Sequence, residues 1–333
     1  MEIIDVTLRE SVLCENVIDI PLALKITEML SYTMVNFIEI GYLKNSQDQE
    51  NSLRNYSPDY INKSFESCGG RKKLSAMIHP EDFQPILYDE KAITKLSLVR
   101  VTCNPKNIHM NRDIINYFHG LGIRTSINLI RSSHYTIQEL ADCLAFAKEY
   151  GADCFYLADS NGHLLPNQVK QRIKNLKEIS DNIKIGFHPH NNLGLATINS
   201  LEALRAGVDM LDSSLLGYGK GAGNLRTEFL PIDLARIGDK YNIDSLRELF
   251  NVAKYFYDNM YTTKPFEEEF RFAIYGLFDI DLDFEEKINQ LSKKGDCTMH
   301  HLIFRYLDDC LRDKIKPNIG YKSDGFKFNK KGC

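Results

Sequence analysis

The sequence predicts a (β/α)8 TIM barrel with a C-terminal helical extension. Eight short apolar runs, rich in β-branched residues, recur along the first 240 residues, and their ends lie 25 to 36 residues apart. That interval is the length of one strand–helix unit in a parallel sheet. A doubly wound sheet would place a Gly-x-Gly-x-x-Gly turn after its first strand. This chain has Leu-Arg-Glu-Ser at residues 8–11, which favours the barrel.

The eight apolar runs are the expected strands, in chain order. They are Ile3–Thr7, Phe37–Tyr42, Leu74–Ile78, Leu96–Cys103, Thr125–Ile130, Cys154–Asp159, Ile183–His190 and Met210–Gly217. Between them lie segments whose apolar residues recur at helical spacing. The clearest are Leu22–Tyr32, Ile137–Tyr150 and Leu193–Ala206, and the last two are followed by a glycine suited to a helix C-cap.

The composition divides the chain into three parts. Residues 1–240 are expected to form the catalytic barrel. Residues 241–315 carry apolar and aromatic side chains at helical spacing, which predicts a helical extension that caps the barrel or forms a subunit interface. Residues 316–333 are polar and contain prolines and glycines, which predicts an extended or disordered tail.

Composition and charge exclude several classes of protein. The chain has 333 residues, of which 43% are hydrophobic and 26% charged, as in soluble globular proteins. The net charge of −4 argues against nucleic acid or an anionic membrane as a partner. No apolar stretch approaches the ~20 residues that span a bilayer. The N-terminus is not of signal-peptide type, and the eight cysteines form no Cys-x-x-Cys pair, so we expect a cytoplasmic protein with reduced thiols.

The most informative motif is His188-Pro-His190, which ends the seventh apolar run. Residues two apart on a strand point to the same face, so the two imidazoles should lie side by side. Neutral imidazoles so placed can bind a metal ion. An isolated His-x-His is more often an incidental surface feature, so the interpretation depends on the other strand ends.

In a barrel of this type, functional groups gather at the C-terminal ends of the strands. The first run is followed by Arg9 and Glu10. One carboxylate and two imidazoles form a common ligand set for a divalent metal. After the eighth run, a loop with four glycines ends at Asn224, whose amide oxygen could be a further ligand. Taken alone, such a loop is more often a flexible turn. At other strand ends we expect Glu39, Asn128 and Asp159 to bind substrate.

Five motifs together resemble a family of metal-dependent aldolase and acyl-transfer barrels. The motifs are Asp5-Val-Thr-Leu-Arg-Glu10, Phe37-Ile-Glu-Ile-Gly41, Asp159-Ser-Asn-Gly162, His188-Pro-His-Asn-Asn-Leu-Gly194 and Gly217–Asn224. The family includes 4-hydroxy-2-oxovalerate aldolase, 3-hydroxy-3-methylglutaryl-CoA lyase, and the isopropylmalate and homocitrate synthases. The glycine loop, with Lys-Gly-Ala-Gly-Asn, is closest to that of the 4-hydroxy-2-oxovalerate aldolases.

The resemblance implies a function and a set of roles. Glu10, His188 and His190 would bind Mn²⁺ or Mg²⁺, with Zn²⁺ or Co²⁺ as alternatives, and Asn224 would be an additional ligand or lie just behind them. Arg9 would stabilise an enolate oxyanion, and Tyr275 resembles a late tyrosine of the aldolases. The implied reaction cleaves or forms a carbon–carbon bond next to the keto group of a 2-oxo acid, with an aldehyde as the second substrate or product. The family also implies a homodimer and an aldehyde dehydrogenase as partner.

Two departures from the family leave questions open. Most members have Asp where this chain has Glu10, whereas the homocitrate synthases resemble this chain in having Glu. The aldolases place a catalytic His at the position of Leu13, which cannot move a proton. The base must then come from elsewhere or act through water, and the candidates are His79, His134, His300, His301 and Tyr275. For each of these a structural role is the more common one.

Two other functions therefore stay open beside the aldolase. Glu10 favours a Claisen-type synthase that joins an acyl-CoA to a 2-oxo acid. Leu13 favours a barrel that has lost catalysis and serves as a partner protein, although nothing structural requires Glu10, His188 and His190 together.

Overall fold

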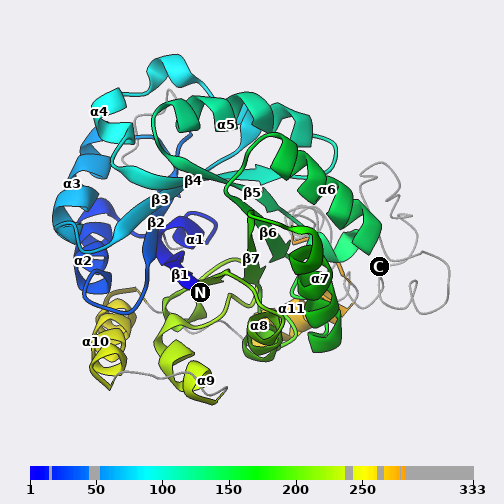
Figure 1. The fold of residues 1–333 in the computed structure, drawn as a ribbon. Helices are drawn as coiled ribbons and strands as arrows, with labels where there is room; N and C mark the ends of the chain where they lie inside the picture. The colour runs from blue at the N-terminus through cyan, green and yellow to red at the C-terminus, as the bar shows by residue number, and fades with distance from the viewer. Residues whose placement is uncertain (15–16, 45–52, 237–242, 261–265, 278, 283–333) are drawn as a thin grey trace, which may run out of the picture.

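The computed structural model describes residues 1–14, 17–44, 53–236, 243–260, 266–277 and 279–282. Within them, eight parallel strands pair in chain order and close into a barrel through β1 and β8 (Figure 1). The strands are β1 (Glu2–Asp5), β2 (Phe37–Tyr42), β3 (Lys73–Ile78), β4 (Leu96–Cys103), β5 (Arg124–Leu129), β6 (Cys154–Asp159), β7 (Lys184–Pro189) and β8 (Met210–Ser213). The predicted fold class is confirmed.

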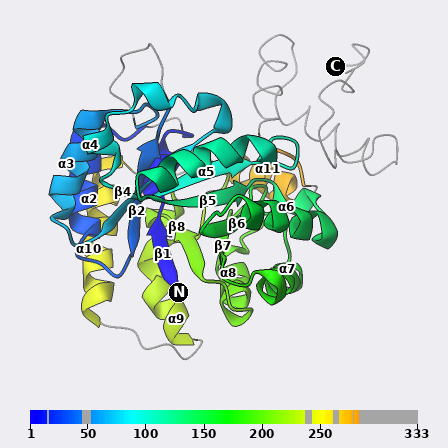
Figure 2. The same cartoon turned by 45° about the horizontal axis from the view of Figure 1, so that its top comes forward.

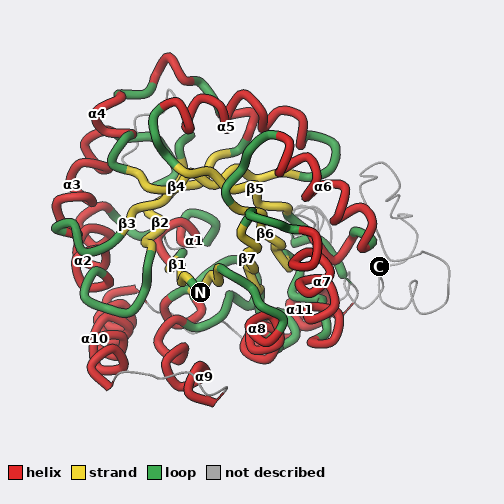
Figure 3. The backbone as a smooth tube through the Cα atoms, in the orientation of Figure 1, coloured by secondary structure: helices red, strands yellow, loops and turns green. Residues whose placement is uncertain are grey.

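Most helices lie outside the ring of strands, whereas the short helix α1 (Thr7–Ser11) lies within that ring in the view of Figure 3. The other helices are α2 (Ile20–Leu30), α3 (Pro58–Cys68), α4 (Glu90–Ile93), α5 (Asn111–Gly120), α6 (Ile137–Glu149), α7 (Pro166–Ile179), α8 (Ala196–Arg205), α9 (Leu230–Arg236), α10 (Ile243–Met260) and α11 (Phe266–Leu277). Several start signals in the sequence explain where they begin. Asp19 caps α2, Ser57 caps α3, and Thr136 forms a capping box with Glu139 at the start of α6.

The barrel interior is layered because side chains alternate along each strand. Its lower layer is apolar and includes Phe37, Leu98 and Met210. Two residues further along the same strands, the same inward face carries Glu39, Arg100 and Asp212, all fully buried. An apolar plug therefore supports a charged layer that faces the C-terminal ends of the strands. The larger hydrophobic core lies between the outer face of the sheet and the helices.

The structure corrects two strand ends. The first strand stops at Asp5, and Thr7 begins the short helix α1. Asp5 Oδ1 accepts a hydrogen bond from the Thr7 backbone N–H at 3.0 Å, which turns the chain out of the sheet. The eighth strand stops at Ser213, and a 3₁₀ turn with two left-handed residues, Leu216 and Gly217, follows. Apolar content continued past both ends, so periodicity alone could not locate them.

The C-terminal extension is described only in part. Helix α10 packs against α2, beside which it lies in Figure 2. The C-terminal end of α11 reaches the loop after β6, where His163 Nδ1 donates to the Gly276 backbone oxygen at 2.8 Å. At residues 279–282 the backbone is not helical, and Asp279 has a φ of 53°. We call residues 276, 277 and 279–282 the strap. The rest of the extension and the predicted tail at 316–333 lie outside the described residues, as do His300 and His301.

In the described part of the chain, none of the helices combines the length and apolar character that crossing a membrane requires.

Candidate metal centre

Three side chains from opposite ends of the sequence meet at the C-terminal end of the barrel. Glu10, His188 and His190 each offer one ligand atom, and these atoms all lie within 4.8 Å of one another. His188 Nε2 lies 3.6 Å from Glu10 Oε1 and 3.2 Å from His190 Nε2. All three residues are buried. The convergence predicted from the strand ends is therefore present in the structure.

Local backbone structure brings each ligand to this place. The one-turn helix α1 turns the chain over the barrel mouth immediately after β1, so that Arg9 and Glu10 point inward and are buried. His188 is still part of β7, whereas His190 follows it and pairs with Asn224 through an isolated antiparallel bridge. That bridge ties the loop after β7 to the glycine loop after β8.

The hydrogen bonds of both histidines leave their Nε2 atoms facing the centre. His188 Nδ1 donates to Asp212 Oδ2 at 2.9 Å, because a carboxylate can only accept. His190 Nδ1 donates to the backbone oxygen of Lys220 at 3.3 Å. Each Nε2 then presents its lone pair. Two lone pairs 3.2 Å apart beside a carboxylate repel one another unless a proton or a cation lies among them, so the donor set suits a divalent cation.

Asn224 offers a fourth ligand atom, its amide oxygen. Its Nδ2 donates to the Tyr218 backbone oxygen at 3.3 Å, and its buried Oδ1 has no hydrogen-bond partner among the described residues. A buried amide oxygen without a donor is costly unless another group satisfies it. Gly219 allows this approach, since a Cβ there would lie 2.3 Å from Asn224 Nδ2 and 2.7 Å from Glu10 Oε2. Glu10, His188, His190 and Asn224 together therefore fit a divalent metal ion.

A chain of ion pairs lies directly beneath these ligands. Arg9 Nε donates to Glu39 Oε2 at 2.8 Å, and Arg9 Nη1 contacts Glu10 Oε1. Arg100 Nη1 donates to Glu39 Oε1 at 3.1 Å, and its Nη2 donates to Asp212 Oδ2 at 2.5 Å. Asp212 in turn accepts from His188. The chain thus runs from Arg9 through Glu39, Arg100 and Asp212 to His188.

These contacts set the ionisation of the site. Burial raises the pKa of Glu10, but the charge of Arg9 and the neighbouring imidazoles outweigh it and lower that pKa to about 2. Burial, together with His188, lowers the pKa of His190 to about 3. Burial likewise raises the pKa of Asp212, but Arg100 and the hydrogen bond from His188 hold it below its usual value. The carboxylate is thus ionised and the His190 imidazole neutral, the states that bind a metal.

The three residues predicted to bind substrate lie at or below the barrel mouth. Both Glu39 oxygens are taken by arginines, as described above. When the Asn128 amide oxygen faces Arg100, it accepts from Nε at 3.2 Å and from Nη2 at 2.8 Å. Asp159 accepts from the backbone N–H groups of His163 and Leu164, and burial raises its pKa to about 6. Each has a defined structural partner, and its role in binding substrate stays a prediction.

Tyr275 is brought to the same end of the barrel by the strap. It is buried in α11, and a Cβ on its neighbour Gly276 would lie 3.0 Å from the Asn192 Cβ in the loop after His190. Arg131 pairs with Asp281, and His134 Nε2 lies 3.4 Å from Asp279 Oδ2. Asn161 Nδ2 donates to Asp279 Oδ1 at 2.8 Å. These contacts hold the strap across the loops after β5, β6 and β7.

Two of the residues predicted as candidate general bases, His134 and His79, lie at different places around the barrel mouth. His134 is engaged by the strap. His79 lies at the end of β3, where its ring stacks on Tyr42 with centroids 5.3 Å apart and its Nδ1 lies 2.7 Å from Thr102 Oγ1. Burial lowers the pKa of His79. Leu13 is 41% exposed at the rim of the mouth. The identity of the base stays open between these residues and water.

Sequence reasoning assigned no role to two residues that the structure places at the centre of the site. They are Arg100 in the fourth strand and Asp212 in the eighth. The signal that could have found both is a charged residue inside an otherwise apolar, fully buried strand. A buried charge of this kind must have a partner, and two of opposite sign on different strands of one barrel predict each other.

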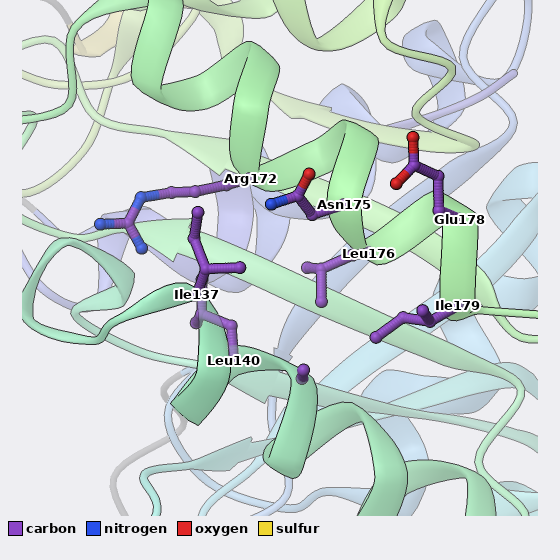
Figure 4. A pocket seen from close by; sticks show the side chains of 8 residues that line it. Ile137, Leu140, Arg172, Asn175, Leu176, Glu178 and Ile179 are labelled. Atoms are coloured by element: carbon purple, nitrogen blue, oxygen red, sulfur yellow. The ribbon is translucent and has the colours of Figure 1, made fainter.

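A separate pocket lies on the outer surface between α6 and α7 (Figure 4). It is lined by apolar residues that include Ile137, Leu140 and Leu176, with Arg172 at its side, and its volume is about 310 Å³. None of its lining residues belongs to the metal centre.

The fold and this set of side chains define the class: a (β/α)8 barrel with a carboxylate–histidine–histidine site that could hold a divalent metal at its mouth. The model of the HMGL-like family matches residues 94–254. A 4-hydroxy-2-oxovalerate aldolase from Chloroflexus aggregans is 30% identical over 247 residues, which are 73% of this chain and 71% of that protein. The chain belongs to the HMGL-like family, and the resemblance inferred from the five motifs is confirmed.

Other relatives are matched over a shorter part. A 4-hydroxy-2-oxovalerate aldolase from Geobacillus genomosp. 3 is 34% identical over 188 residues, so this chain spans only 55% of its length. Among solved structures, the N-terminal domain of a candidate aldolase from Bacteroides vulgatus superposes with a TM-score of 0.74 at 20% identity. That superposition covers 92% of this chain and all of the other, and it supports the fold alone.

Proposed function

We propose that this protein is a divalent-metal-dependent aldolase that cleaves or forms a carbon–carbon bond next to the keto group of a 2-oxo acid. The observation that carries the proposal is the convergence of Glu10, His188 and His190, with the unpaired Asn224 oxygen, beside the guanidinium of Arg9. The 4-hydroxy-2-oxovalerate aldolases among the relatives support the substrate class.

The reaction needs a Lewis acid on the keto oxygen and a positive charge beside the enolate oxygen that develops from it. The hydroxyl at C4 of a 4-hydroxy-2-oxo acid loses its proton, the C3–C4 bond breaks to release an aldehyde, and the electron pair moves into the enolate of pyruvate, whose C3 then takes up a proton. A divalent ion held by Glu10, His188, His190 and Asn224 would supply a Lewis acid for the keto oxygen. Mn²⁺ or Mg²⁺ suits the oxygen ligands, although two imidazoles also accept Zn²⁺ or Co²⁺.

Arg9 is placed to oppose the charge that develops on the enolate oxygen. Burial lowers the pKa of Arg9, but Glu10 and Glu39 raise it well above its ordinary value, so the guanidinium stays charged throughout the reaction. Glu39 fixes its orientation through Nε. A charge fixed in advance costs no reorganisation when the negative charge appears, which is the basis of this kind of stabilisation. Glu39 would thus act by positioning Arg9.

The test is release of pyruvate from 4-hydroxy-2-oxovalerate, with Mn²⁺ added to protein that has been stripped of metal. We expect turnover that is lost in His188→Ala and retained in His119→Ala, a matched histidine bonded to Asp153 outside the site. Unchanged turnover in His188→Ala would contradict the mechanism. Parallel assays with acyl-CoA and 2-oxo acids would show free thiol if the chain were a Claisen-type synthase instead.

The family resemblance supports three further proposals. The protein would act in the cytoplasm, form a homodimer, and pass its aldehyde product to an aldehyde dehydrogenase. Light scattering of the purified protein tests the dimer. Co-purification of aldehyde dehydrogenase activity with the tagged protein from its native cells tests the partner.

A further inference from the structure

Arg100 occupies an unusual position for an arginine. It lies in the middle of β4, and its side chain is fully buried in the barrel interior. Below it the aromatic ring of Tyr156 lies 4.3 Å from the guanidinium carbon. A buried guanidinium is retained only where its hydrogen bonds are satisfied, so the partners of Arg100 show what it does.

Those partners connect two halves of the metal centre. Nη2 binds the same Asp212 oxygen, Oδ2, that accepts the hydrogen bond from His188 Nδ1. Nη1 binds Glu39 Oε1, while the other oxygen of that carboxylate holds Arg9. One planar guanidinium therefore fixes two carboxylates, and each carboxylate orients a different functional group.

We propose that Arg100 is the positioning residue of this metal centre: by bridging Asp212 and Glu39 it sets the tautomer and orientation of His188 and the orientation of Arg9 together. The inference rests on the proposed metal site, and it adds a residue that touches neither metal nor substrate.

Experiment can distinguish whether Arg100 orients the metal-binding residues or affects metal binding only through its positive charge. The site holds three carboxylates, of Glu10, Glu39 and Asp212, and two guanidinium groups, of Arg9 and Arg100. Removing Arg100 makes the site more negative, so its charge alone would make a divalent cation bind more tightly. If Arg100 positions the ligands, the same removal weakens metal binding. The two roles predict opposite signs.

The experiment measures Mn²⁺ affinity by isothermal titration, independently of catalysis. We expect Arg100→Gln to weaken binding by about 10- to 100-fold, the usual effect of removing a residue that orients metal ligands. Arg100→Lys restores the charge but cannot bridge two carboxylates with fork geometry, so we expect it to recover only part of the affinity. Arg124→Gln is the matched control: this arginine lies on the adjacent strand β5, near Glu2 at the other end of the barrel.

Arg100→Gln could leave Asp212 as an uncompensated buried charge and unfold the protein. The double variant Arg100→Gln/Asp212→Asn removes that charge at nearly constant volume. Because Arg100 acts partly through Asp212, we expect the loss of Mn²⁺ affinity in the double variant to be smaller than the product of the two single losses. We also expect its thermal melting to be closer to wild type than that of Arg100→Gln.

Two results would overturn the inference. One is a folded Arg100→Gln protein that binds Mn²⁺ as tightly as wild type or more tightly. The other, should that variant not fold, is a folded double variant with wild-type affinity. If wild type has aldolase activity, kcat of the Arg100→Gln variant should fall by a larger factor than its KM rises, because Arg9 acts on the charge that develops in the transition state. If Mn²⁺ affinity depends on Arg100 as expected but wild type has no aldolase activity, the proposed function fails and the positioning role stands.

Discussion

Gly186 on β7 lies directly against the ring of Tyr156 on β6. The two residues are paired in register, and a Cβ built on Gly186 would come within 2.4 Å of Tyr156 Cζ. The absent side chain is what allows the tyrosine to fill the interior and to lie under Arg100.

The first prediction follows from this packing. Gly186→Ala should push the Tyr156 ring upward against Arg100 and cost about 1–3 kcal/mol of stability by overpacking. Thermal unfolding measures that loss, and titration should show weaker Mn²⁺ binding. Gly120→Ala is the control, because a Cβ there meets nothing within 4 Å. Equal melting temperatures for the two variants would mean that the ring is not constrained by Gly186.

The second prediction concerns Gly219. Its added Cβ would meet the ends of two flexible side chains, those of Asn224 and Glu10, and not backbone. Gly219→Ala should therefore leave stability nearly unchanged while it displaces two ligands, and Mn²⁺ affinity should fall about 10-fold or more. Titration and thermal melting of the same preparation check both parts. A variant that binds Mn²⁺ normally would show that the ligands lie elsewhere.

The third prediction tests the amide oxygen of Asn224. Asn224→Ala removes an oxygen that has no hydrogen-bond partner in the described part of the chain, so we expect little loss of folded-state hydrogen bonding from Oδ1 and about 10-fold weaker Mn²⁺ binding. Asn224→Asp replaces that oxygen with a charged one and should bind Mn²⁺ at least as tightly as wild type. If both substitutions had the same effect, the oxygen would not be a ligand.

The fourth prediction concerns the strap and pH. Burial lowers the pKa of His134, but the hydrogen bond and charge of Asp279 raise it above 6.5 overall. Its stabilising contribution is therefore complete below 6.5 and is lost as pH rises through the raised pKa. Burial raises the pKa of Asp279, but His134 and Asn161 lower it below 3.8, so that group's contribution is lost only as pH falls through the lowered value.

Wild type and His134→Gln should therefore differ most in thermal stability between about pH 4 and pH 6.5, and the difference should shrink above that range. Melting curves of both proteins across pH provide the measurement. A difference that is constant with pH would show that His134 is held by packing and not by its charge.

The sequence was sufficient to predict the barrel and the convergence of Glu10, His188 and His190, for two physical reasons. Strand–helix alternation has a period that few folds share. Glu10, His188 and His190 stand at strand ends, where topology alone brings side chains together. The strand ends are set by the hydrogen bond that the Thr7 backbone N–H donates to Asp5 and by the left-handed residues after Ser213, and neither leaves a trace in apolar periodicity.

The charged layer was harder to foresee because it depends on register between strands. Arg100 reaches Glu39 and Asp212 only because β2, β4 and β8 are staggered so that these side chains stand at the same height in the barrel. A sequence shows which face a residue takes on its own strand, but not its height relative to a strand more than a hundred residues away. The path of the strap could not be predicted for the same reason, since Asp279 finds its partners after β5 and β6.

Closure of the barrel has a consequence for how the protein reaches its working state. Glu10 and the loop residue Lys220, which donates a backbone hydrogen bond to it, are 210 positions apart in the chain. The first and last strands must meet before these groups can touch, and contacts so distant in sequence form late and slowly. Metal binding during refolding would thus report completion of the barrel. A chain still being synthesised, in which β8 has not yet left the ribosome, would not bind the metal ion.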